Sequence, residues 1–95
     1  MCNIPERVKS EIISFAKQYE IDKVYLFGSR ARGDNHERSD IDLAFCGGIH
    51  TDEFRECLME NLWTLLKVDV ICLDEMPDSF VTEVEKEGII LYEKI

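Results

Sequence analysis

The sequence is short of basic residues. Its 11 Lys and Arg face 20 Asp and Glu, which gives a formal net charge of −9. Repulsion at long range then opposes general binding to nucleic acid or to an anionic membrane surface. A basic protein partner, or a substrate that carries its own cation, fits this charge better. The acidity by itself has an equally simple explanation, because net charge also keeps a small protein soluble.

Long hydrophobic runs and cysteine pairs are missing as well. No run approaches the roughly 20 apolar residues that span a bilayer, and the first residues, MCNIPERVKSEI, are too polar for a signal peptide. The cysteines have no C-x-x-C spacing and mostly lie among apolar neighbours, which predicts reduced thiols instead of disulfides or a zinc site. They are Cys2, Cys46, Cys57 and Cys72. We therefore expect a cytoplasmic protein with no membrane contact.

Two common nucleotide-binding motifs do not occur. Neither G-x-x-x-x-G-K-[ST] nor G-x-G-x-x-G is present, which argues against P-loop and dinucleotide-binding proteins. His36 and His50 each lack a second histidine, cysteine or carboxylate at zinc-ligand spacing, so both are predicted to face solvent. Trp63 and the leucines near it are interpreted as core or interface residues.

The length of 95 residues predicts a single domain over residues 1–95, with no room for a separate substrate domain. The periodicity of apolar residues predicts an α/β (α+β) fold, with a small mixed sheet of about four strands flanked by helices. The expected elements are a helix over 5–19, strands over 23–27, 40–45, 67–73 and 88–93, a helical turn after Gly28, a long helix capped by Thr51, and a short helix from about 77 to 87. The long helix is expected to bury Phe54, Leu58, Leu62, Leu65 and Leu66.

Carboxylates interrupt the strand predicted over 40–45. Asp40 and Asp42 alternate with apolar residues, so both acidic side chains lie on one face. Neighbouring carboxylates raise each other's pKa, whereas Mg²⁺ accepts them as hard oxygen ligands. If the strand predicted over 67–73 pairs beside them, Asp69 adds a third ligand.

The second half of the candidate site is the stretch FGSR. Gly28 directly follows a buried strand and allows the backbone to approach a ligand, while the N–H groups of the next turn and the Ser29 hydroxyl can bind phosphate. Arg30, Arg32 and Arg38 can neutralise a triphosphate. Carboxylates with a pair of metal ions beside a phosphate cradle are the parts that in-line displacement at phosphorus requires.

Each of these features alone has a simpler explanation. A lone Asp-x-Asp after Ser39 is more often a cap or a turn, and single arginines are more often solvated loop charges or ion-pair partners. Asp69 alone could be a strand-edge residue. The functional interpretation depends on the combination, because each feature stands at the end of a strand or on one face of it.

The spacing Gly28, Ser29, ten residues, Asp40, Ile41, Asp42 resembles the G-S-x(10)-D-x-D signature of minimal nucleotidyltransferases in the DNA polymerase beta superfamily. The resemblance covers the chain, with VDVI at the third acidic position and EKEGIILYE as the ending. The chain looks most like the stand-alone antitoxin of two-gene HEPN/MNT toxin–antitoxin systems. No position of the motif is substituted, so the resemblance gives no reason to expect an inactive enzyme.

The resemblance implies a site and a reaction. Gly28 and Ser29 would hold the triphosphate of ATP, Asp40 and Asp42 would bind two Mg²⁺ ions, and Asp69 would complete the site and help to deprotonate the acceptor. The implied reaction moves a nucleoside monophosphate, AMP from ATP, to a hydroxyl group such as a tyrosine of a partner HEPN ribonuclease. That modification would silence the toxin.

Other functions stay open at this point. An acidic surface also suits an antitoxin that blocks its partner by stoichiometric contact, with carboxylates that are vestigial or structural. Transfer to tRNA or another nucleic acid is disfavoured by the net charge of −9 and by the lack of a basic helix or an aromatic platform. The sequence does not decide whether the chain forms a homo-oligomer.

Overall fold

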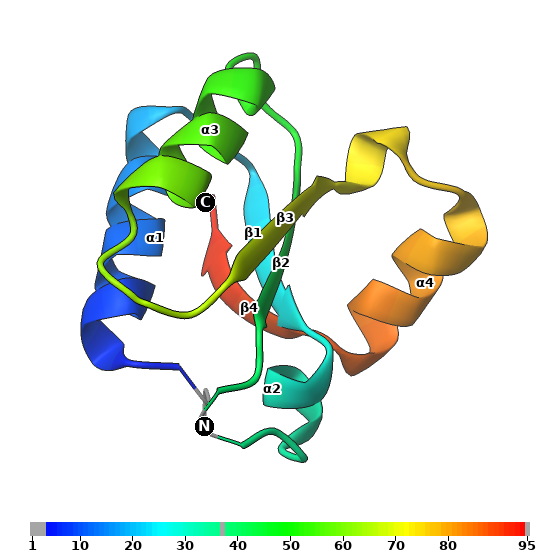
Figure 1. Cartoon of the computed structure of the whole chain (residues 1–95). Helices are drawn as coiled ribbons and strands as arrows, with labels where there is room; N and C mark the ends of the chain where they lie inside the picture. Colours follow the sequence, from blue (N-terminus) through cyan, green and yellow to red (C-terminus); the bar gives the residue numbers. More distant parts are fainter. Residues whose placement is uncertain (1–3, 37, 95) are drawn as a thin grey trace.

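Helices cover both faces of one sheet in the computed structural model, which describes residues 4–36 and 38–94 (Figure 1). Helices α1 and α3 lie on one face, and α4 lies on the other. The elements follow in the order α1 (Glu6–Gln18), β1 (Lys23–Phe27), α2 (Ser29–Arg32), β2 (Ile41–Cys46), α3 (Thr51–Asn61), β3 (Val68–Cys72), the 3-10 turn η1 (Leu73–Glu75), α4 (Asp78–Glu87) and β4 (Ile89–Glu93).

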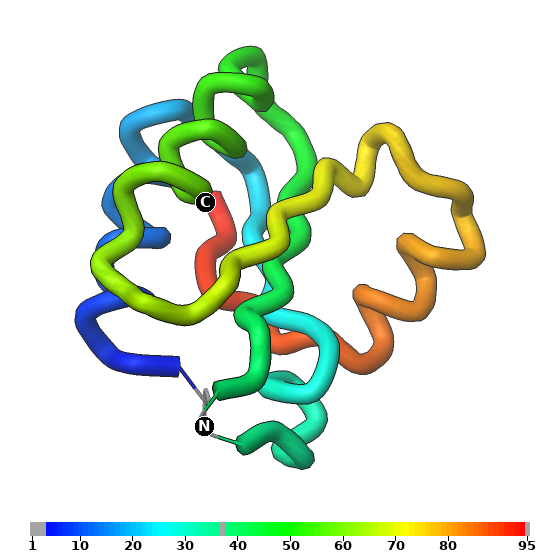
Figure 2. The backbone as a smooth tube through the Cα atoms, in the orientation of Figure 1, coloured from blue at the N-terminus to red at the C-terminus, as the bar shows by residue number. Residues whose placement is uncertain are grey.

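The sheet is mixed and has the strand order β3-β2-β1-β4. Strand β1 is antiparallel to both β2 and β4, whereas β2 and β3 are parallel. A parallel pair needs a crossover, which α3 supplies between β2 and β3. Figure 2 shows the chain leaving α3 in a wide turn before it enters β3. As a result, the first residues of β2 and β3 lie side by side at the same end of the sheet.

Alternation along the strands divides the core into two layers. Val24 and Leu26 of β1 pack towards α1 and α3, whereas Tyr25 packs towards α4. In β2 the residues of the first layer are Ile41, Leu43 and Phe45, and Ala44 belongs to the second. Asp42 therefore points to the α4 side of the sheet, where it is half-buried.

The predicted fold class is confirmed, and most element boundaries agree within one or two residues. The strand predicted over 40–45 begins at Ile41, so Asp40 precedes it and is exposed. The strand predicted over 67–73 spans Val68–Cys72 and continues into η1. The turn after Gly28 is a single turn of helix, as expected.

Helix α3 departs from the prediction at both ends. His50 occupies the N-cap position, so Thr51 is the first helical residue and not the expected cap. The helix ends at Asn61, because Leu62 takes an extended conformation with φ −69° and ψ 132°. The expectation that Leu65 is buried is therefore wrong: its exposed fraction is 107%. Trp63 was expected in the core or at an interface, and its exposed fraction of 66% excludes the core.

The remaining structural expectations concern cysteines, histidines and membrane contact. Cys46, Cys57 and Cys72 are free thiols, as predicted, and Cys2 lies outside the described residues. His36 and His50 are both exposed, as predicted. No helix within the described ranges has the length and apolar character to cross a bilayer.

Candidate active site

The end of β1 brings the backbone directly against an acidic side chain. Gly28 has φ +75° and ψ −155°, a conformation that residues with side chains avoid. A Cβ atom at this position would collide with the Asp42 carboxylate. Glycine is therefore required for the Gly-Ser turn to close onto the strand that carries the carboxylate.

The sheet register places two of the predicted carboxylates next to each other. Asp42 lies opposite Phe27 of β1 on one side and opposite Asp69 of β3 on the other. The Asp69 side chain is 47% exposed, and its Oδ1 atom lies 3.9 Å from the Lys67 Nζ atom. This pairing follows from the parallel β2–β3 arrangement, because both residues stand second in their strands.

The charged form of Asp42 is disfavoured. Burial raises the pKa of its carboxyl group above the ordinary value of 3.8, and the charges of Asp69 and Asp40 raise this pKa further. Arg32 and Lys67 act in the opposite direction without cancelling the rise. Perturbed carboxylates of this kind are typical of functional sites, although structural ion-pair networks produce them too. Additional positive charge at this point would favour the ionised form.

Arg30 fixes the loop that leads to Asp40. Its side chain is charged and yet buried, with 5% of its surface exposed, which holds for no other charged residue among those described. Its Nε atom donates to the carbonyl oxygen of Ser39 at 3.0 Å, and its Nη2 atom lies 3.5 Å from the carbonyl oxygen of His36. The His36 N–H donates to Ser39 Oγ at 3.0 Å, which closes the same loop. The sequence predicted Arg30 to be a phosphate ligand or, taken singly, a solvated loop charge or an ion-pair partner. It did not predict these bonds to the loop carbonyls.

The remaining predicted phosphate ligands surround α2. The N–H groups of Ala31 and Arg32 both donate to the Gly28 carbonyl oxygen at 3.1 Å, so these donors are engaged within the turn. Ser29 is half-buried at the start of α2, and Arg38 is exposed in the loop that follows. Arg32 forms a surface ion pair with Asp34, in which its Nε atom lies 3.2 Å from Asp34 Oδ2. The assignment of Ser29 and Arg38 to phosphate binding stays a prediction.

A cavity of about 220 Å³ opens beside Gly28. Phe27 and Phe80 line it and meet edge to face, with ring centroids 6.0 Å apart, and α4 contributes Glu83 and Glu87. The sequence predicted α4 but missed these lining residues. The amphipathic pattern of α4 does not indicate which end of the sheet this helix approaches.

Mg²⁺ suits the chemistry of the acidic residues. Asp40, Asp42 and Asp69 offer hard oxygen ligands, and a divalent cation would relieve the repulsion that raises the pKa of Asp42. Within the described ranges, however, no three His, Cys, Asp or Glu side chains stand close enough to hold a metal ion by themselves. Asp42 and Asp69 are brought together, whereas Asp40 stays outside the strand. Phosphate and water would therefore have to complete the coordination of the ion.

The comparison with known families decides the relationship of the chain. Residues 10–95 match the family described as Polymerase beta, Nucleotidyltransferase. The chain belongs to this nucleotidyltransferase family. The matched range includes Gly28, Ser29 and the three carboxylates, and the four-stranded mixed sheet agrees with the fold that the family predicts. Among the curated proteins, none matches the chain.

Solved structures of nucleotidyltransferase fold resemble the chain over most of its length. A toxin–antitoxin complex with AMP-PNP is 25% identical, with a TM-score of 0.73 over 90% of this chain and 73% of that one. A minimal nucleotidyltransferase is 25% identical, with a TM-score of 0.63 over 85% and 86% of the two chains. An MNT antitoxin complex with a tri-AMPylated HEPN toxin from Shewanella oneidensis is 22% identical, with a TM-score of 0.65 over 92% and 71%. At that last identity the likeness shows the fold alone.

Proposed function

We propose that this nucleotidyltransferase depends on Mg²⁺ and transfers AMP from ATP to a hydroxyl group of a HEPN-family partner protein, which it thereby silences as an antitoxin. The observation that carries the proposal is the close approach of Gly28 to Asp42, which itself lies opposite Asp69. The turn suited to phosphate and the acidic strand ends thus meet at one point. Further support comes from a structural relative, which is described as a toxin–antitoxin complex with AMP-PNP.

In the proposed reaction, the acceptor oxygen attacks the α-phosphorus of ATP. A bond from this oxygen to phosphorus forms, the bond to pyrophosphate breaks, and Asp69 receives the proton of the hydroxyl group. Gly28 and Ser29 bind the triphosphate and hold its phosphorus in line with the attacking oxygen. Asp40 and Asp42 would hold Mg²⁺, which when bound supplies positive charge for the phosphate oxygens.

Label transfer tests this proposal. The chain is incubated with Mg²⁺, ATP labelled at the α-phosphate and the HEPN protein encoded by the neighbouring gene, and the label on the partner is measured. We expect transfer by the wild type, and a rate lower by about 10³ or more in Asp40→Asn/Asp42→Asn. The control is Asp52→Asn, an exposed carboxylate in the first turn of α3. Absence of label with the wild type, or equal rates in both variants, would contradict the proposal.

Stoichiometric neutralisation is the second candidate function. It is favoured by the exposed apolar side chains after α3, among them Trp63 and Leu65. The same variants separate the two functions when the ribonuclease activity of the partner is measured together with the label. Full neutralisation of the partner by Asp40→Asn/Asp42→Asn, without any label, would mean that binding alone accounts for the antitoxin role.

A further inference from the structure

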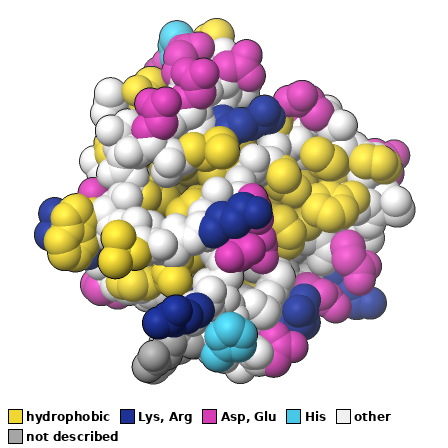
Figure 3. All heavy atoms as spheres, in the orientation of Figure 1, with side chains coloured by type: hydrophobic (Ala, Val, Ile, Leu, Met, Phe, Trp, Pro, Cys, Tyr) yellow, Lys and Arg dark blue, Asp and Glu magenta, His cyan; other side chains and the backbone are white. Residues whose placement is uncertain are grey.

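Exposed apolar side chains concentrate in one short segment, residues 59–65. Met59, Trp63 and Leu65 are exposed by 59%, 66% and 107%, and among the described residues only two other large hydrophobic side chains stay so exposed. Figure 3 shows the corresponding hydrophobic area over the connection between α3 and β3. Contiguous apolar surface of this kind marks an interaction site more often than isolated apolar residues do.

Trp63 is held in place by helix α1. The guanidinium carbon of Arg7 lies 4.1 Å from the centroid of the indole ring, and the Trp63 backbone N–H donates to Glu11 Oε1 at 3.0 Å. An aromatic side chain that is already ordered loses little conformational entropy on binding. Tryptophan is also enriched among the residues that dominate the energy of protein interfaces.

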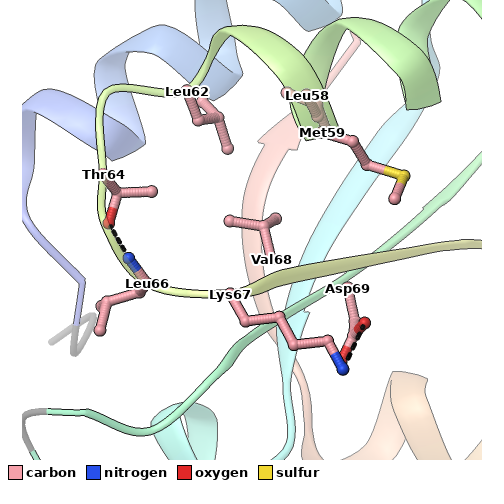
Figure 4. A pocket seen from close by; sticks show the side chains of 8 residues that line it. All are labelled: Leu58, Met59, Leu62, Thr64, Leu66, Lys67, Val68 and Asp69. Carbon is pink, nitrogen blue, oxygen red and sulfur yellow. Dashed lines mark hydrogen bonds and ion pairs between the residues drawn. The ribbon is translucent and has the colours of Figure 1, made fainter.

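A hollow connects this segment with the candidate active site. It has a volume of about 310 Å³ and is lined by residues from the end of α3 to the start of β3. In Figure 4, Leu62 and Val68 point into it, and the Lys67–Asp69 ion pair stands at one end. A second hollow of about 470 Å³ is formed by residues 62–65. A molecule seated on this segment therefore reaches Asp69.

The charges around the segment favour a basic partner. Glu56 and Glu60 are exposed and stand one helical turn apart, on either side of Met59 in the sequence. The cations at the segment are already engaged, since Arg7 of α1 lies over the Trp63 ring and Lys67 pairs with Asp69. A second copy of this chain, with its own charge of −9, would bring like charges together, and so would nucleic acid. A surface with an apolar centre and basic rim is complementary.

We propose that residues 59–68 form the docking surface for the protein acceptor. The partner inserts an apolar side chain beside Trp63 and Leu65, surrounds it with basic residues, and thereby brings its hydroxyl group to Asp69. This inference rests on the proposed function, because Asp69 is the group that receives the hydroxyl proton in that reaction. It assigns the acceptor to the class of folded, basic proteins and assigns recognition to a surface outside the carboxylates.

The first test measures the affinity and the transfer kinetics of docking variants. Trp63→Ser and Leu65→Ser are titrated calorimetrically with the HEPN protein of the neighbouring gene. The matched control is Ile49→Ser, which removes a side chain that is 83% exposed before α3. We expect Kd and the KM for the partner to rise at least tenfold in both docking variants, with kcat within twofold of wild type and no change in the control. Wild-type Kd in Leu65→Ser, whose side chain makes no core contact that could unfold the chain, would overturn the proposal.

The second test uses Trp63 as the single tryptophan of the chain. With 5-fluorotryptophan incorporated, its ¹⁹F resonance should shift on addition of the partner, in the wild type and equally in Asp40→Asn/Asp42→Asn. Weaker binding by Leu65→Ser without any label transfer by the wild type would refute the proposed function and leave the docking surface intact. Transfer by Leu65→Ser at the wild-type KM, or a dimer of the chain alone that Leu65→Ser dissociates, would refute the docking surface.

Discussion

At Asp42 the requirements of folding and of the site oppose each other. Burial and the neighbouring carboxylates Asp69 and Asp40 raise the pKa of this group, so the folded chain binds its proton more tightly than the unfolded chain does. The stabilising contribution of that proton is complete below the unfolded pKa and is lost as the pH rises through the folded pKa. Ionised Asp42 therefore lowers stability at neutral pH when no cation is bound.

Replacement of this carboxylate should thus stabilise the protein. Without Mg²⁺, Asp42→Asn is expected to have a higher free energy of unfolding than the wild type at neutral pH, and the difference should shrink as the pH falls towards the ordinary carboxyl range. Urea unfolding at a series of pH values measures this. Asp52→Asn, an exposed carboxylate, should show no such trend. A wild type that is more stable than Asp42→Asn at neutral pH without Mg²⁺ would contradict the interpretation.

Gly28 offers a second test at the scale of one residue. Gly28→Ala should cost about 1–3 kcal/mol of stability and prevent ATP binding, because the backbone has φ +75° and the new Cβ would displace Asp42. Gly48→Ala is the matched control. Gly48 follows the opposite end of β2 and has φ +110°, and a Cβ atom there would meet the Glu20 carbonyl oxygen. Denaturation and calorimetry should show both variants destabilised, and ATP binding lost only in Gly28→Ala. Wild-type ATP affinity in that variant would be incompatible with the site described above.

Strands and helices were largely predictable because their patterns are local. The apolar run before Gly28 and the alternation after Asp40 each predict a strand, and Gly88 ends α4 as a helix-stopping residue should. The end of α3 was missed, since no glycine or proline follows Asn61 and the leucines continue the helical spacing. The leucine that extends the pattern, Leu65, belongs instead to the exposed segment.

The loop between α2 and β2 is held by a contact that no local sequence pattern reveals. Arg30→Lys keeps the positive charge but loses the fork that binds the carbonyl oxygens of Ser39 and His36. We expect a loss of about 1–3 kcal/mol of stability and a fall in kcat, because the approach to Asp40 is loosened. Arg38→Lys, at an exposed position of the same loop, should leave stability unchanged. Equal stability of Arg30→Lys and wild type in urea unfolding would show that Arg30 does not hold the loop.

Across the whole molecule, the candidate site exists only because distant segments meet through the sheet order. Gly28 lies between β1 and α2, whereas Asp42 and Asp69 belong to β2 and β3, and the motif spacing predicted the first two residues together. The third required the parallel β2–β3 pairing, which fixes Asp69 opposite Asp42. The sequence could not predict that Asp40 stays outside the strand or that the carboxylates do not form a complete metal cage within the described ranges. Those features depend on register and side-chain position.

Calorimetric titration with ATP tests most directly whether these segments make one nucleotide site. In the presence of Mg²⁺ we expect one ATP to bind the wild type with a Kd between about 1 μM and 1 mM. No binding is expected after removal of Mg²⁺ by EDTA, and none in Asp42→Asn, a variant expected to fold at least as well as the wild type. ATP binding of equal strength without Mg²⁺, or in Asp42→Asn, would contradict the account.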